Sequence, residues 1–393
     1  MRYVGIDVGA EKHVVASVNE VSEVLSKPVG FSETSEGYAK LKSLLGEASD
    51  VLVAMEATGH YWRNLFAFLA SEGYRVALLN PLRTSRFAGE DLLRAKTDGV
   101  DAQSIARFAA QKRPAPSALT DEATTDLKEL VRFRDRTVQD FGDKLRQLHR
   151  LVDLGFPEFT SFVKSMDSEL ATSLLAKWPT AKAFAAAKPR TVAYLRYDGR
   201  HFVGLELASQ LVTAAKTSVA AHHGPAYQVQ VKCLCEDLQV LRERIRALDS
   251  DINDTLDKHQ VGKLLTTIDG IGSNTAARII AEAGDPARFR DGAALAAYVG
   301  VVPGTSQSGK RQPLRSSLSP IGNGRLRRAL WMPLLTAVRR NPWLKRFYDR
   351  LILAGKLPKV ALIAALRKLL HAIHSVARTR TAFVPRLTEE AAA

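Results

Sequence analysis

The first eighty residues alternate short apolar runs with segments whose apolar residues recur at helical spacing. Strands are predicted at 3–9, 14–18, 24–31, 51–56 and 75–79, and helices at 38–45 and 61–69. Strands that follow one another closely form an antiparallel meander, whereas strands that alternate with helices form β-α-β units. This order predicts an RNase H-like mixed sheet, in which the first strand is central and lies beside the strand at 51–56.

Two long amphipathic helices are predicted farther along, at 121–153 and 227–256. In both, apolar residues recur at threes and fours with Arg and Lys between them. Two interpretations are open: an antiparallel coiled coil, within one subunit or across a dimer, and two helices of a globular bundle in one subunit. Residues 160–225 carry no motif that indicates a function.

The fold class predicted from these patterns is α/β plus α. A mixed-sheet domain at 1–115 is followed by a region of long helices at 116–260, which serves as linker and oligomerisation region. A mostly helical domain follows at 261–380, and residues 381–393 form a frayed tail.

Four carboxylates are the first candidates for chemistry. Asp7 lies in an apolar strand that tolerates a charge only if something binds it, and Glu56 ends a second apolar run. Asp98 and Asp101 are three residues apart at the start of a helix and share one face. Singly, each has a simpler interpretation as a core acid, a surface acid or a helix cap. Together they predict a site for two divalent ions that acts on a phosphodiester.

The net charge of the chain indicates the kind of partner that it binds. The 393 residues carry a formal net charge of +15, which favours nucleic acid first and an acidic membrane surface second. There is no apolar run of transmembrane length, and Asp7 and Glu11 lie where a signal peptide is apolar. We therefore expect a soluble, cytoplasmic protein with no membrane partner.

The last third of the chain concentrates basic and glycine residues. Gly270 and Gly272 form a tight turn before an Ala-rich helix, either a helix-hairpin-helix-like turn that offers N–H groups to a phosphate or a plain turn between helices. Between 310 and 350 there are eleven basic residues and one acid. A solvated basic face is one interpretation, but the interleaved aromatic residues favour nucleic-acid contact. The candidate contacts are Lys310, Arg311, Arg315, Arg325, Arg327 and Arg328.

Several short motifs occur in a fixed order. They are G-I-D-V at Gly5, M-E-A-T-G-H-Y-W at Met55, K-T-D-x-x-D-A at Lys96, G-I-G at Gly270, Q-S-G at Gln307 and I-G-N-x-R-L-R-x-A-L at Ile321. In this order they resemble the DEDD-type, Piv-like insertion-sequence transposases, the family of bridge-RNA-guided DNA recombinases, over nearly the whole chain.

The resemblance implies an N-terminal RuvC-like domain with Asp7, Glu56, Asp98 and Asp101 as the catalytic, metal-binding tetrad, holding two Mg²⁺ or Mn²⁺ ions. It also implies a C-terminal transposase domain whose nucleophile is Ser308. Further implications are a homo-oligomer, dimer or tetramer, that acts on DNA near the bacterial nucleoid with a structured non-coding guide RNA. No histidine lies near Ser308 in sequence, Ser306 is an alternative nucleophile, and Lys310 is placed to steady the scissile phosphate.

Three other functions fit parts of the pattern. A junction resolvase or nuclease would use the four carboxylates with water and need no serine. The segment from Val4 to Gly9 also looks like the first phosphate loop of sugar-kinase and actin-like ATPases, but a second Asp-Gly phosphate loop and an adenosine site are missing from the sequence. A non-catalytic nucleic-acid-binding protein explains the charge but not the acids.

Overall fold

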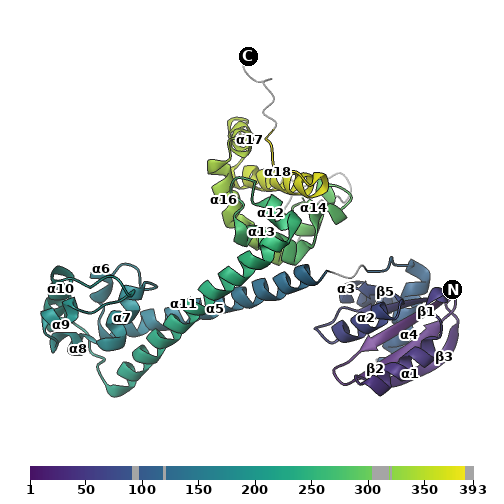
Figure 1. Ribbon diagram of the computed structural model, residues 1–393, viewed down its shortest axis with the longest axis horizontal. Coiled ribbons are helices and arrows are strands. Elements are labelled where there is room, and N and C mark those ends of the chain that lie inside the picture. Colours follow the sequence, from purple (N-terminus) through teal and green to yellow (C-terminus); the bar gives the residue numbers. More distant parts are fainter. Residues whose placement is uncertain (91–96, 118–120, 303–317, 319–320, 386–393) are drawn as a thin grey trace, which may run out of the picture. The chain divides into compact units, whose positions relative to one another are not determined.

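The computed structural model describes residues 1–90, 97–117, 121–302, 318 and 321–385 (Figure 1). The chain divides into two compact units, Met1–Thr120 and Asp121–Ala393. The finer division into domains drawn from the sequence stays a prediction.

The N-terminal unit is built on a mixed sheet. Its strands are β1 (Arg2–Val8), β2 (Lys12–Val18), β3 (Val24–Ser32), β4 (Val51–Glu56) and β5 (Arg75–Leu79), in the spatial order β3-β2-β1-β4-β5. β1, β2 and β3 pair antiparallel, whereas β1, β4 and β5 pair parallel. β1 is therefore central, and the arrangement fits the RNase H-like sheet expected from the sequence.

Helices cover both faces of this sheet. They are α1 (Ser35–Leu45), α2 (Trp62–Ser71), α3 (Pro81–Glu90) and α4 (Asp98–Lys112), with a short 3-10 helix at Ala48–Asp50. One face carries Val4 and Ile6 into a core with residues of α1 and α2. The opposite face carries Tyr3 and Leu52 into a second core with residues of α3 and α4. Because side chains alternate along a strand, the two faces divide odd from even positions of β1.

Two long helices organise the C-terminal unit. α5 (Glu122–Gly155) and α11 (Pro225–Lys258) are 34 residues each and lie side by side within one chain (Figure 1). Arg134 Nε donates to Asp249 Oδ1 at 2.5 Å, and Lys144 Nζ pairs with Asp237 Oδ2 at 2.5 Å, so the helices run antiparallel. A regular coiled-coil packing and pairing across a dimer stay predictions.

A small helical subdomain occupies the segment between the long helices, for which the sequence indicated no motif. Its helices are α6 (Phe159–Phe162), α7 (Glu169–Lys177), α8 (Ala181–Ala185), α9 (Pro189–Ala193) and α10 (Leu205–Lys216). Phe156, Phe159 and Phe184 are fully buried at the centre of its core, with ring centroids 5.3 to 6.0 Å apart. Leu148 of α5 and Leu234 of α11 join this core. The subdomain therefore caps one end of the helix pair.

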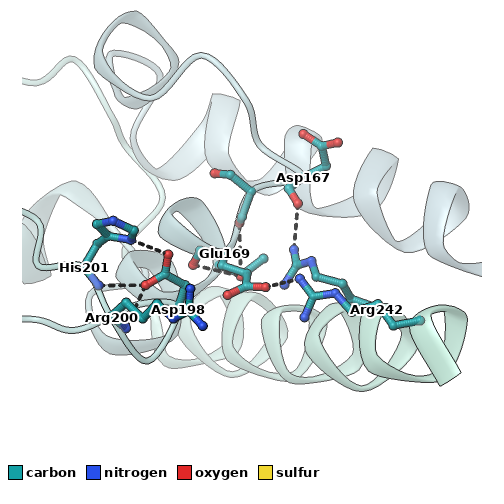
Figure 2. A network of polar contacts seen from close by, with 9 residues as sticks. Asp167, Glu169, Asp198, Arg200, His201 and Arg242 are labelled. Atoms are coloured by element: carbon teal, nitrogen blue, oxygen red, sulfur yellow. Dashed lines mark hydrogen bonds and ion pairs between the residues drawn. The ribbon is translucent and has the colours of Figure 1, made fainter.

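A polar network ties the loops of this subdomain to α11 (Figure 2). Asp198 accepts hydrogen bonds from the backbone N–H groups of Arg200 and His201 and contacts His201 Nδ1 at 2.7 Å. These hydrogen bonds, that from the His201 side chain first, hold the pKa of Asp198 well below its usual range. Arg242 of α11 donates to the carbonyl oxygen of Asp167 at 2.7 Å. Since its polar groups bond to one another, we interpret this network as structural.

The rest of the unit is a helical domain at the other end of the pair. Its elements are α12 (Gln260–Leu265), α13 (Ser273–Ala283), a 3-10 helix at Pro286–Arg288, α14 (Gly292–Val299), α15 (Gly324–Ala329), α16 (Trp331–Arg340), α17 (Pro342–Leu353) and α18 (Pro358–Thr379). Leu127 of α5 and Ile252 of α11 join its core.

One helix differs from the sequence expectation. Within the part of the chain that the structure describes, α18 alone is long and apolar enough to cross a membrane by length and composition, whereas no such segment was expected. Leu366, Leu369 and Ile373 are fully buried in the domain core, and 56% of the helix's most apolar window is buried. A core helix of a globular domain has these properties, so the finding is weak support for a membrane span.

Candidate active site and nucleic-acid interface

The geometry of the sheet brings two of the predicted carboxylates to one edge. β1 and β4 are parallel neighbours, with Ile6 paired to Met55, so Asp7 and Glu56 follow at the carboxyl ends of adjacent strands. Val4 and Ile6 point into the core beneath α1 and α2. By the alternation of a strand, Asp7 lies on the opposite face, towards α3 and α4.

Helix α4 supplies the remaining two acids, and a glycine sets its distance from the sheet. Thr97 caps the helix by accepting from the N–H of Val100 at 3.4 Å, which leaves Asp98 and Asp101 in the first turn, where the helix dipole favours negative charge. A Cβ at Gly5 would lie 2.2 Å from the carbonyl oxygen of Ala102. The backbone of α4 therefore touches the backbone of β1 where the two elements cross, and Asp101 lies just before this point of contact.

Three of the four acids line one pocket of about 390 Å³, and they are Asp7, Glu56 and Asp101. Asp98 does not line it and is exposed in the first turn of α4. The buried Thr84 of α3 donates a hydrogen bond from its hydroxyl to Glu56 Oε1 at 2.5 Å. This bond restrains the Glu56 carboxylate from the α3 side of the pocket.

The donor set of this pocket fits a hard divalent cation, because carboxylate and hydroxyl oxygens are the ligands that Mg²⁺ and Mn²⁺ prefer. The carboxylates are farther apart than the ligands of a formed metal centre. Among the described residues, no three His, Cys, Asp or Glu side chains lie close enough together to hold an ion as they stand. The pocket thus offers suitable oxygen ligands that would have to draw together around the metal.

Sequence reasoning missed the residues that position these acids. Thr84 carried no motif signal. Gly5 belongs to the G-I-D-V motif, and Ala102, Ala106 and Ala109 recur near helical spacing on the fully buried side of α4. A glycine in a strand together with a stripe of small residues on a helix signals a close approach of backbones, and this would have been the available clue.

The predicted serine lies outside the described residues, as do Ser306, Lys310, Arg311 and Arg315. The two ends of the segment that holds them are described, and they meet. A Cβ at Gly322 would lie 2.5 Å from Cα of Gly300, and both glycines have positive φ, +131° and +81°. Residues 300 and 322 are therefore clamped together by backbone contact that only glycine permits.

A partly buried carboxylate supports this clamp. Glu282 of α13 accepts from Arg132 Nε of α5 at 3.0 Å and from the Asn323 side chain at 3.1 Å, and its backbone carbonyl accepts from the Tyr298 hydroxyl at 2.6 Å. Burial raises the pKa of Glu282, but the hydrogen bonds from Arg132 and Asn323 and the Arg132 charge outweigh it, so the pKa lies below its usual value. Asn323 Oδ1 in turn caps α15 by accepting from the N–H of Leu326 at 3.0 Å.

The arginines of α15 divide into two groups. Arg325 and Arg328 are exposed. Arg327 is partly buried, and its guanidinium donates to the carbonyl oxygens of Val299 and Gly300, both at 3.3 Å. Arg327 thus holds the clamp together, a task that the sequence did not indicate, while Arg325 and Arg328 remain candidates for nucleic-acid contact.

The two glycines of the turn, Gly270 and Gly272, have different surroundings. A Cβ at Gly270 would lie 2.5 Å from Cβ of Ala337, so this glycine permits close packing of the turn on α16. Gly272 is exposed, has no atom near the position of a Cβ, and is the N-cap residue of α13, to which it supplies no side-chain hydrogen bond. Phosphate binding therefore stays a prediction for Gly272, whereas the packing against Ala337 explains Gly270.

Comparisons with known proteins identify the family of this chain. A family model for the DEDD transposase of IS110 type, described as a transposase, matches residues 4–157, and a model of the transposase IS116/IS110/IS902 family matches 262–349. The 43.6 kDa protein of insertion element IS110 from Streptomyces coelicolor is 26% identical over 391 residues, which cover 98% of this chain and 96% of the relative. The pilin gene-inverting protein of Moraxella bovis is 25% identical, with 91% of each chain covered.

Among solved structures, T. thermophilus RuvC in complex with a Holliday junction substrate aligns with 30% of this chain and 99% of its own, at 16% identity and a TM-score of 0.24. A similarity this low carries no argument. The two family models together span more than half of the chain, beginning on β1 and including the clamp. This protein is a DNA transposase. It belongs to the IS110 type of insertion-sequence transposases.

Proposed function

We propose that this transposase cleaves and exchanges DNA strands by metal-dependent chemistry at the pocket of Asp7, Glu56 and Asp101. The observation that supports this most is the meeting of three carboxylates from β1, β4 and α4 in a single pocket of an RNase H-like sheet. Asp98, one turn before the pocket, is the fourth member of the set. We assign the four acids to two Mg²⁺ or Mn²⁺ ions.

When bound there, divalent ions would polarise phosphate oxygens and stabilise the negative charge that develops on a phosphodiester. The protein residues have separate tasks. Thr84 holds Oε1 of Glu56 and thereby sets the orientation of the whole carboxylate. Gly5 fixes the depth of α4, on which Asp101 depends.

In the proposed exchange, Ser308 is the nucleophile. Its Oγ loses a proton and forms a bond to phosphorus, and one P–O bond of the DNA breaks, so that the leaving oxygen takes up a proton as a hydroxyl. A hydroxyl of the second strand reverses this step, which restores a phosphodiester and frees the serine without ATP. Ser306 is the alternative nucleophile and Lys310 is assigned to the scissile phosphate; the three residues lie outside the described part of the chain.

The partners follow from charge and from family membership. The net charge of +15 and the exposed Arg325 and Arg328 support DNA as the partner. By the resemblance to bridge-RNA-guided recombinases, we propose that an element-encoded RNA selects the target and that the protein acts as a homo-oligomer in the cytoplasm. Because the carboxylates and Ser308 belong to different units of the chain, the reaction requires the two units, from one subunit or two, to act together.

Strand cleavage and exchange on DNA that carries the element ends and a target tests this mechanism, with Mg²⁺ and the element's RNA present. We expect Asp7→Asn and Ser308→Ala to abolish exchange, and a covalent protein-DNA adduct to form with the wild type but not with Ser308→Ala. If Ser308→Ala still cuts and the wild type forms no adduct, the protein is a water-using nuclease of the junction-resolvase kind.

A further inference from the structure

The groove between α17, α18 and the C-terminal segment that follows is a second cavity of functional interest. It has a volume of about 890 Å³, within the range typical of ligand sites. Trp343 and Phe347, one turn apart on α17, form one wall, and Arg367 and Lys368 of α18 form another. Phe383, beyond the end of α18, lies on the third side. Neither Asp nor Glu lines this groove among the described residues.

Lysine and aromatic groups are already arranged inside the groove. The Lys368 ammonium lies 4.4 Å from the ring centroids of both Trp343 and Phe347, a cation–π geometry. Phe383 meets Trp343 edge to face at 5.5 Å, and its backbone N–H donates to the Thr267 hydroxyl at 2.8 Å. Burial, and secondly the charge of Arg350, lower the pKa of Lys368. These contacts hold the side chains that line the groove in place, and the Lys368 ammonium would gain from an anionic neighbour.

The surroundings of the groove carry the same charge. The helices α16 and α17 hold five basic residues, Arg339, Arg340, Lys345, Arg346 and Arg350, of which Lys345 pairs with Asp349. An acidic protein segment would meet the charge, but it would not use the partly buried rings of Trp343 and Phe347 that line the groove. A second copy of this chain would bring its own positive charge to the same place.

We infer that this groove binds single-stranded nucleic acid, with an unpaired base stacked on the aromatic wall of Trp343 and Phe347 and the neighbouring phosphates beside Arg367 and Lys368. Aromatic platforms flanked by cations bind single strands in this way, because every base has a π face and every linkage a negative charge. The inference extends the proposed function by assigning a place to an unpaired strand, and it rests on that function only for the presence of nucleic acid.

Equilibrium binding to fluorescent single strands tests this inference on the full-length protein. The probes are oligothymidylate, an abasic strand of the same length and charge, and oligouridylate. For the wild type we expect oligothymidylate to bind about tenfold or more tightly than the abasic strand, since one stacked base contributes that much. Trp343→Leu should remove this preference and leave abasic binding nearly unchanged. The ratio of oligothymidylate to oligouridylate binding tells whether the groove prefers DNA or RNA.

Two further variants complete the design. Tyr194→Leu removes an exposed aromatic residue outside the groove, 76% exposed, and should keep the wild-type preference. Phe347→Leu keeps an apolar side chain of similar size and should lower the preference in part, so it decides the matter if Trp343→Leu does not fold. Equal binding of base-containing and abasic strands by the wild type, or a full preference in folded Trp343→Leu or Phe347→Leu, would overturn the inference. Because no strand is cut in this assay, its outcome is independent of whether Ser308 is the nucleophile.

Discussion

Replacing Gly5 by alanine should separate the sheet from α4 and disable the acidic pocket without touching an acid. The added Cβ would lie 2.2 Å from the carbonyl oxygen of Ala102 and 2.3 Å from the backbone nitrogen of Ala106. Both atoms belong to the helix backbone, so no side-chain rotation relieves the clash. Shortening Ala102 or Ala106 to glycine would not relieve it either.

The size of the effect follows from these distances. To restore ordinary contact, α4 must recede by roughly 1 Å, and Asp101, which precedes Ala102, must move with it. Overpacking of this kind costs about 1–3 kcal/mol of stability. A displacement of about 1 Å at a catalytic group lowers the rate by roughly a hundredfold. We therefore expect a modest loss of stability and a much larger loss of strand cleavage.

Hydrogen exchange by mass spectrometry and strand cleavage measure the two parts separately. Peptides from α4 should exchange faster in Gly5→Ala than in the wild type, while peptides of the C-terminal unit remain unchanged. Gly30→Ala on β3 is the matched control, because its Cβ would meet nothing closer than 3.9 Å. Wild-type exchange in α4 together with wild-type cleavage in Gly5→Ala would refute the close approach of helix and strand as the device that positions Asp101.

Two other changes test the polar contacts of single carboxylates. Thr84→Val removes the shorter of the two hydroxyl hydrogen bonds that Glu56 accepts while keeping the shape of the side chain, so we expect about ten- to hundredfold slower cleavage and a higher Mg²⁺ requirement, with Thr84→Ser close to wild type. Unchanged Mg²⁺ dependence in Thr84→Val would speak against that role. Glu282 has a lowered pKa in the folded protein, so its ionised form contributes stability above its ordinary pKa of about 4.3, and that stability is lost as pH falls through the lower folded value. Thermal unfolding should therefore show Glu282→Gln destabilised at neutral pH, with the difference from wild type shrinking below about pH 4; a constant difference across this range would contradict the Arg132 pairing.

Much of the architecture can be predicted from local patterns of apolar and polar residues. Local apolar patterns predicted the five strands and the helices α1 and α2 of the N-terminal unit, but not α3, and the prolonged three-four spacing predicted the helices now seen as α5 and α11. These patterns can be detected in a single sequence because each depends only on residues a few positions apart. The acids at Asp7 and Glu56 were found for the same reason, since a charge at the end of an apolar strand is conspicuous wherever the strand packs.

Tertiary structure decided what depends on contacts between distant segments. The approach of α4 to β1 brings Asp101 into the pocket and leaves Asp98 outside it. In the C-terminal unit, an arginine from a basic stretch, Arg327, bonds to backbone carbonyls, and Gly270 accommodates Ala337. Spacing along the chain gives each residue's type and helical face. Which backbone it meets is set by the packing of whole elements, and this depends on the summed contacts of many residues rather than on any local pattern.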